Sequence, residues 1–430
     1  MKYGAEKTVA RFLEISLWLF AFSVAWSSAL YRISLLFILV GVPVHAILRM
    51  VNPDFQLRDV LSRNAEKIYY LLLPVALYGW IALTWFWTPA NAELYTNDLW
   101  AYTKLLAIPL FSIYLYRLFP DRLESLLYAY CLGVIVLMIP TYLDFMGVFR
   151  ALGLHVEGNS SYFPENGVSR NLVYWKNQII HGFHVSVLLA FLVHMMPAKG
   201  LRRYVHFFVI ALCVFDIGYL IAGRMAIFSL LVAAISAVPR HYFSQRRGLL
   251  LFAGFAFLAA VMVSVDSSVS SRLYSIWDQS ARFFQNNDIT TSSGIRLYYW
   301  SLSLENFMKH PLLGAGAGSF REALVSLNPE LASQNHFHPH NEYITLISQF
   351  GLIGFSLFLM MLGGLYFGVR RTPAGVVRSC LLSFIVVFCV NALSDASLHN
   401  IWEGWTFVLL SSVGLALIFK NQRDVATSIH

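Results

Sequence analysis

The apolar stretch IYYLLLPVALYGWIALTWFW, residues 68–87, decides the fold class of this chain. It carries no charged side chain, and it is as long as the roughly 20 residues that a helix needs to cross the hydrocarbon core of a bilayer. Within lipid, only helices and closed barrels satisfy their own backbone hydrogen bonds. The stretch therefore predicts a membrane-spanning helix.

The composition of the whole chain agrees with this prediction. Of its 430 residues, 58% are hydrophobic and only 13% are charged, whereas an ordinary soluble domain carries roughly 25% charged residues. The net charge of +8 does not indicate nucleic-acid binding, because the basic residues fall between apolar runs and form no single patch. The four cysteines lie inside apolar runs without CxxC spacing, so we expect buried packing residues and no disulfide.

Further stretches of spanning length recur on both sides of residues 68–87. They predict an all-α, polytopic membrane protein with about twelve transmembrane helices. The expected spans lie near residues 12–29, 33–48, 68–87, 99–116, 126–146, 178–196, 204–222, 225–238, 249–265, 341–369, 376–393 and 401–419.

The basic residues set the expected orientation. With the amino terminus in the cytoplasm, about 20 of the 31 Lys and Arg residues fall in cytoplasmic segments, as the positive-inside rule requires. We therefore expect both termini in the cytoplasm. Residues 1–265 would hold nine spans and a periplasmic loop at 147–177, residues 266–340 a large periplasmic loop, and residues 341–430 the last three spans and a cytoplasmic tail. Lys104 falls near the end of the fourth span, where it could snorkel to the interface.

The loop at 266–340 is far longer than a usual connection, which favours a functional role. Apolar side chains at 273, 276, 277, 283 and 284 predict a short helix at the membrane interface. Ser292 or Ser293 is expected to cap a second helix that carries Leu297, Trp300, Leu304 and Phe307 and stops at Pro311. The glycines at 314, 316 and 318 allow close approach of the backbone to a ligand, but no Gly-Lys-Ser/Thr follows as in a P-loop.

The densest polar cluster, residues 335–342, reads NHFHPHNE and ends this loop. Asn341 is expected to cap the tenth span, which would place His340 at a helix amino terminus on the outer face. Such a position disfavours imidazolium, so His340 could accept a proton as a general base. The alternatives are a metal-binding tract, for which Glu342 is the only near additional ligand, or plain solvated histidines.

Basic side chains on the same face form a second constellation. Arg224 lies in a turn so short that its charge must sit close to the bilayer, Arg296 opens the second loop helix, and Arg170 and Lys176 belong to the other loop. Arginine suits pyrophosphate because its planar fork donates two parallel hydrogen bonds. The alternatives are snorkelling to lipid phosphates or pairing with nearby acids. No GxSxG, HExxH, Walker or dinucleotide-binding motif is present, which disfavours hydrolase, zinc and nucleotide chemistry.

Several of these residues also resemble a known family. His340-Asn341, nine residues, then Gly351-Leu352-Ile353-Gly354 is similar to the His-Asn/Ser/Gln-x9-Gly-x-x-Gly signature of O-antigen ligases. Further similarities to this family and to the related O-antigen polymerases lie at Arg296, Trp300 and residues 310–320, at Gly223-Arg224, and more loosely at Ser394-Asp395 and Trp402. Phe355 departs from the family, since many ligases carry a small polar residue there.

The resemblance implies a GT-C-like fold and an inverting glycosyl transfer on the periplasmic face of the bacterial inner membrane. The donor would be O-antigen linked to undecaprenyl pyrophosphate, and the acceptor a sugar hydroxyl of lipid A-core oligosaccharide, so that transfer completes lipopolysaccharide. His340 would act as base, with Arg224 and Arg296 on the pyrophosphate. The expected substrate-binding residues are His338, Asn341, Arg170, Lys176, Trp300 and Gly316, and His338 is also the reserve candidate for the base. No cofactor, metal or nucleic acid is expected; the partners are the two substrates and membrane lipids.

Three rival functions remain at this point. An O-antigen polymerase would use the same donor with a second lipid-linked glycan as acceptor. A transporter or flippase would place ionisable residues at mid-membrane and often shows repeated halves, neither of which is evident here. Protein O-glycosylation is the third, although its enzymes usually carry a longer carboxy-terminal region.

Overall fold

The structure is a computed structural model, and it describes residues 2–50, 68–152, 177–221, 228–229, 232–233, 267–333 and 338–428. All regular secondary structure in these residues is helical. The first half contains α1 (Lys2–Ser23), α2 (Ser28–Met50), α4 (Tyr69–Leu83), α5 (Ala92–Tyr102), α6 (Ala107–Leu118), α7 (Leu123–Phe145), α8 (Val148–Ala151), α9 (Gln178–His194) and α10 (Leu201–Phe215). The second half contains α14 (Ser267–Asn286), α15 (Ser292–Lys309), α16 (Ser319–Leu327), α17 (Pro329–Ala332), α18 (Glu342–Arg370), α19 (Val376–Asn391) and α20 (Ile401–Ser428).

Seven helical segments among the described residues are long and apolar enough to cross a membrane. They are Ser28–Leu48, Tyr69–Phe86, Ala92–Leu118, Pro120–Phe145, Leu201–Leu220, Glu342–Arg370 and Ile401–Asn421. The helices Gln178–His194 and Val376–Asn391 are apolar but shorter. The protein is therefore a multi-pass membrane protein, and its described part is all-helical, as expected.

The finer topology stays a prediction. Of the twelve expected spans, those at 225–238 and 249–265 lie almost wholly outside the described residues. The span expected at 12–29 is helical in α1 only as far as Ser23, and it is not among the seven long apolar segments. The division of the chain at residues 265 and 340, and the periplasmic side of its loops, likewise stay predictions.

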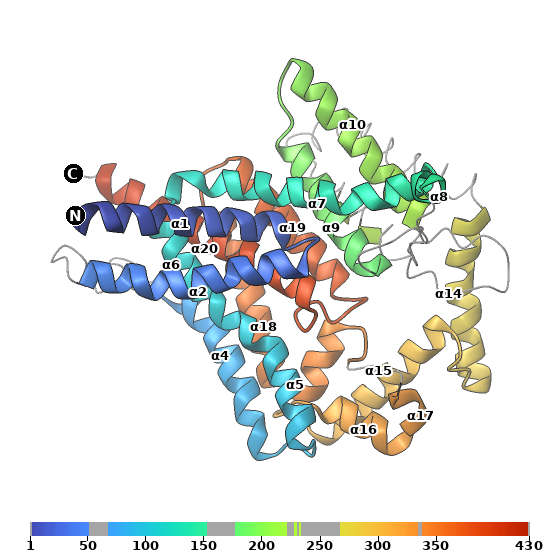
Figure 1. The fold of residues 1–430 in the computed structure, drawn as a ribbon. Coiled ribbons are helices and arrows are strands. Elements are labelled where there is room, and N and C mark those ends of the chain that lie inside the picture. The colour runs from blue at the N-terminus through green and yellow to red at the C-terminus, as the bar shows by residue number, and fades with distance from the viewer. Residues whose placement is uncertain are drawn as a thin grey trace.

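The described helices pack around an aromatic core. α1, α2 and α7 run alongside one another, and the two chain termini lie together at one end of the molecule (Figure 1). Phe20 of α1 meets Phe111 of α6 and Trp405 of α20 edge to face, at ring distances of 5.7 and 5.8 Å. Two segments from the first third of the chain and one from its end thus meet at one buried ring.

A kink divides α18 at Gly351, whose φ is +64°. The kink leaves backbone groups of the helix without their usual partners, and the glycine-rich segment before α16 supplies new ones. The amides of Ala315 and Gly316 donate to the carbonyls of Ser348 and Gln349 at 3.0 and 2.8 Å, and the amide of Leu352 donates to Pro311 at 2.9 Å. This backbone pairing fixes the first part of α18, which begins two residues after His340.

The described part of the region 266–340 holds four helices, α14 to α17, at the opposite side of the molecule from the termini (Figure 1). The first two were expected, whereas the short α16 and α17 were not. The expected cap of α15 is corrected: Thr291 is the N-cap, because its backbone is extended and its Oγ1 accepts from the Gly294 amide at 3.1 Å. In α14, Tyr274, Trp277 and Phe284 are exposed, but contact with the membrane surface stays a prediction.

Candidate functional site

The amino terminus of α18 positions the central histidines. Asn341 is the N-cap, and its Oδ1 accepts from the Ile344 amide at 3.1 Å, as the sequence predicts. Its Nδ2 donates to the carbonyl of Leu393 at 3.0 Å, in the segment that joins α19 to α20. One buried side chain therefore both starts the helix and holds a distant turn against it. His340 lies immediately before this cap.

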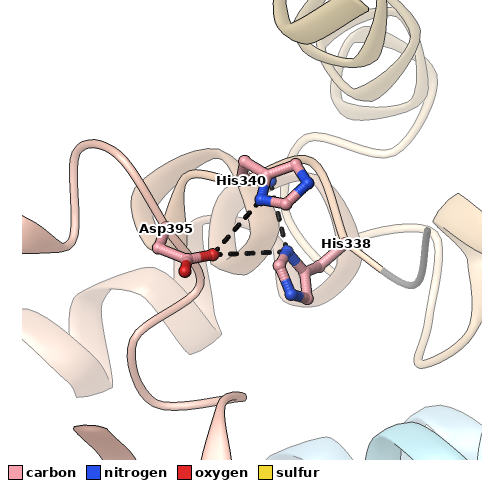
Figure 2. A group of neighbouring side chains, drawn as sticks. All are labelled: His338, His340 and Asp395. Carbon is pink, nitrogen blue, oxygen red and sulfur yellow. Dashed lines mark hydrogen bonds and ion pairs between the residues drawn. The ribbon is translucent and has the colours of Figure 1, made fainter. Parts of the chain in front are cut away.

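The distant turn brings Asp395 to the histidines. Its Oδ1 lies 3.3 Å from Nδ1 of His340 and 3.8 Å from Nδ1 of His338 (Figure 2). The same oxygen accepts from the Ala396 amide at 2.9 Å. In the sequence, Asp395 belongs only to a loose family similarity. The available signal was an acid in a short polar stretch between two apolar runs, which is costly in a membrane protein and usually functional.

The electrostatic balance of this group is set by burial and by the histidines. Burial alone would raise the pKa of Asp395, but the hydrogen bond from His340, the nearby His338 and the Ala396 amide together hold it well below its usual range. Burial lowers the pKa of His338 to about 3, and the neighbouring Asp395 only partly opposes this. At neutral pH the group therefore contains an ionised carboxylate beside a neutral His338.

His340 has an unusual backbone conformation. Its φ is +53°, in the left-handed region that disfavours side chains with a Cβ. The His340 amide donates to Nδ1 of His338 at 3.3 Å, which helps to hold this conformation. Such strained residues persist where the surrounding structure determines them, and they cluster at functional sites.

Helix α15 lies against the same group. The indole of Trp300 donates to the carbonyl of Pro339 at 2.9 Å, and the ring of Tyr299 is nearly parallel to that of His340 at 6.5 Å. Arg296 is on this helix and lies close enough to Asp395 for their charges to interact. Burial lowers the pKa of Arg296 and the carboxylate of Asp395 opposes that effect; a guanidinium remains protonated even so. The predicted residues Arg296, Trp300, His338, His340 and Asn341 are thus brought together.

Gly316 has a different setting. Its φ is +96°, and a Cβ added to it would lie 2.5 Å from Cβ of Thr88. The close approach that the glycine allows is therefore to the segment that follows α4, inside the protein. This gives a packing reason for the glycine, while its role as a substrate-binding residue stays a prediction. Arg170, Lys176 and Arg224 lie outside the described residues.

Glu342 and Lys104 are not where the sequence suggested. The Glu342 carboxylate is buried and is not part of the His338–His340–Asp395 group: it accepts from Tyr102 Oη at 3.1 Å and from the Leu398 amide at 2.8 Å. Lys104 does not snorkel to the interface. It is 5% exposed, and its Nζ donates to the carbonyls of His399 and Asn400 at 3.1 and 2.7 Å, because a turn of the chain covers it.

Among the described residues, the group that could hold a metal ion is His338, His340 and Asp395, whose ligand atoms all lie within 4.8 Å of one another. Three ligands with an open position would suit a zinc ion. However, the ligand atoms already have partners in the protein. His338 Nδ1 accepts from the His340 amide, and Asp395 Oδ1 accepts from the Ala396 amide. His338 Nδ1 and Asp395 Oδ1 therefore each already accept a backbone hydrogen bond within the protein.

The sequence of this chain is similar to a protein family and to individual known proteins. Residues 179–359 match the family described as O-antigen ligase. Over 361 residues the chain is 23% identical to the "Teichuronic acid biosynthesis protein TuaE" of Bacillus subtilis, covering 81% of this chain and 71% of that protein. Over 136 residues it is 24% identical to "Putative polysaccharide ligase RP358" of Rickettsia prowazekii, covering 30% of this chain and 32% of that protein.

The matched region begins in α9 and extends past the kink of α18, so it contains Arg296 and the two histidines. Asp395 lies beyond its end and joins the site through the fold alone. Residues 179–359 of this chain therefore form a domain of the O-antigen ligase family.

Proposed function

We propose that this protein is a membrane glycosyltransferase that ligates a lipid-linked polysaccharide to an acceptor sugar. In its specific form, it transfers O-antigen from undecaprenyl pyrophosphate to a sugar hydroxyl of lipid A-core oligosaccharide. The observation that carries the proposal is the His340–Asp395 pair with Arg296 near enough for its charge to interact with Asp395, since this joins a proton acceptor to a binding group for phosphate. The family match supports a lipid-linked polysaccharide as the substrate class.

His340 fits the role of general base better than His338. The side chain of His340 is 27% exposed, against 13% for His338. In addition, Nδ1 of His338 accepts the His340 amide, so it has a structural task that needs an unprotonated nitrogen. Oδ1 of Asp395 would accept a hydrogen bond from Nδ1 of His340 and so orient the His340 ring. The same carboxylate would stabilise the imidazolium that forms when Nε2 takes the proton of the acceptor hydroxyl.

The reaction would be one in-line displacement. The acceptor oxygen bonds to the anomeric carbon, the bond from that carbon to the pyrophosphate oxygen breaks, and the anomeric configuration inverts. The bond electrons leave with the pyrophosphate, where Arg296, and Arg224 from outside the described residues, would stabilise the added charge. No nucleotide enters this scheme, and the arginines take the place of a metal ion.

Both substrates of this reaction would be anchored in the outer leaflet of the inner membrane, so the site would face the periplasm. Two observations support this orientation. Basic residues gather in the segments assigned to the cytoplasm. The two termini lie together, away from α14 to α17 (Figure 1). Both agree with two cytoplasmic termini and a site at the other face.

A polymerase is the second candidate. TuaE, the relative matched over most of this chain, is named for teichuronic acid biosynthesis and not for a ligation. A polymerase would use the same His340 and Arg296 but would accept a second lipid-linked glycan. The difference between the two functions lies in the acceptor alone.

Purified full-length protein in proteoliposomes, given a lipid-linked glycan donor, would test both candidates. We expect transfer to lipid A-core, little transfer to a second lipid-linked glycan, and the same rate with EDTA. H340A should abolish transfer. H194Q is a matched control, because His194 is also a partly buried histidine with a polar partner, Ser383 Oγ at 2.9 Å. Near-normal ligation by H340A would overturn the assignment, and transfer to the lipid-linked glycan alone would establish the polymerase.

A further inference from the structure

A second histidine–carboxylate pair lies beside the first. His399 belongs to the same turn as Asp395, and its Nε2 lies 3.0 Å from Oδ1 of Asp98 in α5. The other oxygen of Asp98 accepts from the Gly318 amide at 2.9 Å. Asp98 is only 5% exposed and lies within the apolar segment Ala92–Leu118. A buried charge there is costly unless it is paired, so both oxygens have specific partners.

The backbone of His399 is held by two more ionisable side chains. Glu342 Oε2 accepts from the amides of Leu398 and His399 at 2.8 and 3.5 Å, and Lys104 Nζ donates to the His399 carbonyl at 3.1 Å. The ring of His399 also meets the ring of Tyr102 edge to face at 5.8 Å. His399 is therefore fixed through its amide, its carbonyl and its side chain.

The fixed ring of His399 lies next to the histidines of the proposed active site. It lies 5.3 Å from the ring of His338, which in turn lies 4.7 Å from the ring of His340. His338 accepts the amide of His340, whose φ is +53°. A continuous chain of contacts thus runs from Asp98 through His399 and His338 to the backbone of the proposed base, while Asp395 holds its side chain.

We infer that Asp98 and His399 are positioning residues of this site: they hold His338 in place and, through it, the left-handed backbone of His340. This inference rests on the proposed role of His340 as the base. Neither residue needs to touch substrate. Their loss would let the His338 and His340 rings shift, and misplacement by about 1 Å can cost about 100-fold in rate.

Transfer kinetics of the full-length protein in proteoliposomes would test the coupling. We expect D98N and H399Q each to lower kcat by about 10- to 100-fold, with KM for donor and acceptor within about threefold, because the binding groups remain. Since both act through one chain of contacts, the double variant should be no slower than the slower single variant. H194Q, whose parent residue bonds to Ser383 in the helix α19, should keep the wild-type kcat.

A second measurement avoids any dependence on activity. The ring ¹⁵N signals of histidine-labelled protein, assigned with H338N and H340A, should shift for both His338 and His340 in D98N and H399Q but not in H194Q. Three results would overturn the inference: a wild-type kcat in both single variants, a loss of kcat in the double variant equal to the product of the two single losses, or unchanged ring signals. Activity of H340A would instead show that His340 is not the base. The ring signals would still decide whether Asp98 and His399 are coupled to His338 and His340.

Discussion

Nδ1 of His340 lies 3.3 Å from Oδ1 of Asp395, although the two residues are 55 positions apart in the chain. The contact depends on Asn341, whose side chain caps α18 and also bonds to the Leu393 carbonyl. The amide of Glu342 adds bonds to the carbonyls of Ala392 and Asp395 at 2.8 and 3.1 Å. The proposed base and its orienting carboxylate are thus joined by the start of one helix.

Replacing Asp395 by asparagine should therefore affect chemistry more than binding. The asparagine amide can donate to Nδ1 of His340, which favours the tautomer whose Nε2 already carries a proton. We expect D395N to lower kcat by about 10²- to 10⁴-fold with little change in KM, measured in proteoliposomes. D121N is the control, since Asp121 is exposed and pairs with Lys420. A D395N rate within about threefold of wild type would contradict the orienting role.

The charge of Arg296 alone should not be enough for function. Lysine keeps the charge but lacks the planar fork that binds two phosphate oxygens together. We expect R296K to lose at least about tenfold in kcat/KM for the donor, together with weaker inhibition by added undecaprenyl pyrophosphate. R282K is the control, because Arg282 is an exposed arginine paired with Asp278 on α14. Equal inhibition of wild type and R296K by the pyrophosphate would show that Arg296 does not bind it.

The buried His338 should make the protein less stable in acid. Its pKa falls from 6.5, the ordinary value of a solvated histidine, to about 3 in the folded protein. Between these values the unfolded chain binds a proton that the folded protein excludes, so stability is complete above pH 6.5 and falls as pH decreases. Asp395 adds a further loss below its own usual range, about pH 4, because its folded pKa is lowered.

H338N would isolate the histidine contribution. Asparagine can still offer an acceptor to the His340 amide, but it does not titrate. We expect the thermal unfolding midpoint of wild type to fall more steeply than that of H338N between pH 7 and about pH 5. Parallel curves for the two proteins would refute a neutral, buried His338.

The kink of α18 should depend on Gly351. A Cβ there would lie 2.3 Å from the Leu312 carbonyl oxygen, at a φ of +64° that alanine disfavours. We expect G351A to lower the free energy of unfolding by about 2 kcal/mol or more. Gly363, in the same helix, has nothing within 4 Å of its Cβ position, and G363A should be neutral or stabilising by up to about 1 kcal/mol. Equal unfolding midpoints for the two variants would argue against a required kink.

The local features of the site could be predicted from sequence. Pro339 and Asn341 indicate the start of α18, because proline rarely continues a preceding helix and asparagine is a favoured cap. The apolar runs indicate the membrane spans, since periodicity and length act over neighbouring residues. His340, Arg296 and Trp300 were identified together through their residue types and family similarity, and the structure brings them into one group.

The contacts between distant segments could not be predicted in this way. Asp98, Asp395 and His399 come from two segments roughly 300 residues apart, and only the packing of α5, α18 and the turn before α20 brings them together. Lys104 looks like an ordinary interfacial lysine in the sequence, because nothing local shows that residues 398–400 cover it. The kink at Gly351 and its bonding to residues 311–316 likewise follow from tertiary contacts.

The left-handed backbone of His340 sets protein stability against the proposed catalytic role at a single position. Glycine would adopt that conformation without the cost of about 1–2 kcal/mol that a side chain incurs there. Yet glycine carries no imidazole, so the variant that relaxes the chain best would lack the proposed base. A selection for heat resistance alone and a selection for the proposed polysaccharide transfer would consequently drive residue 340 in opposite directions.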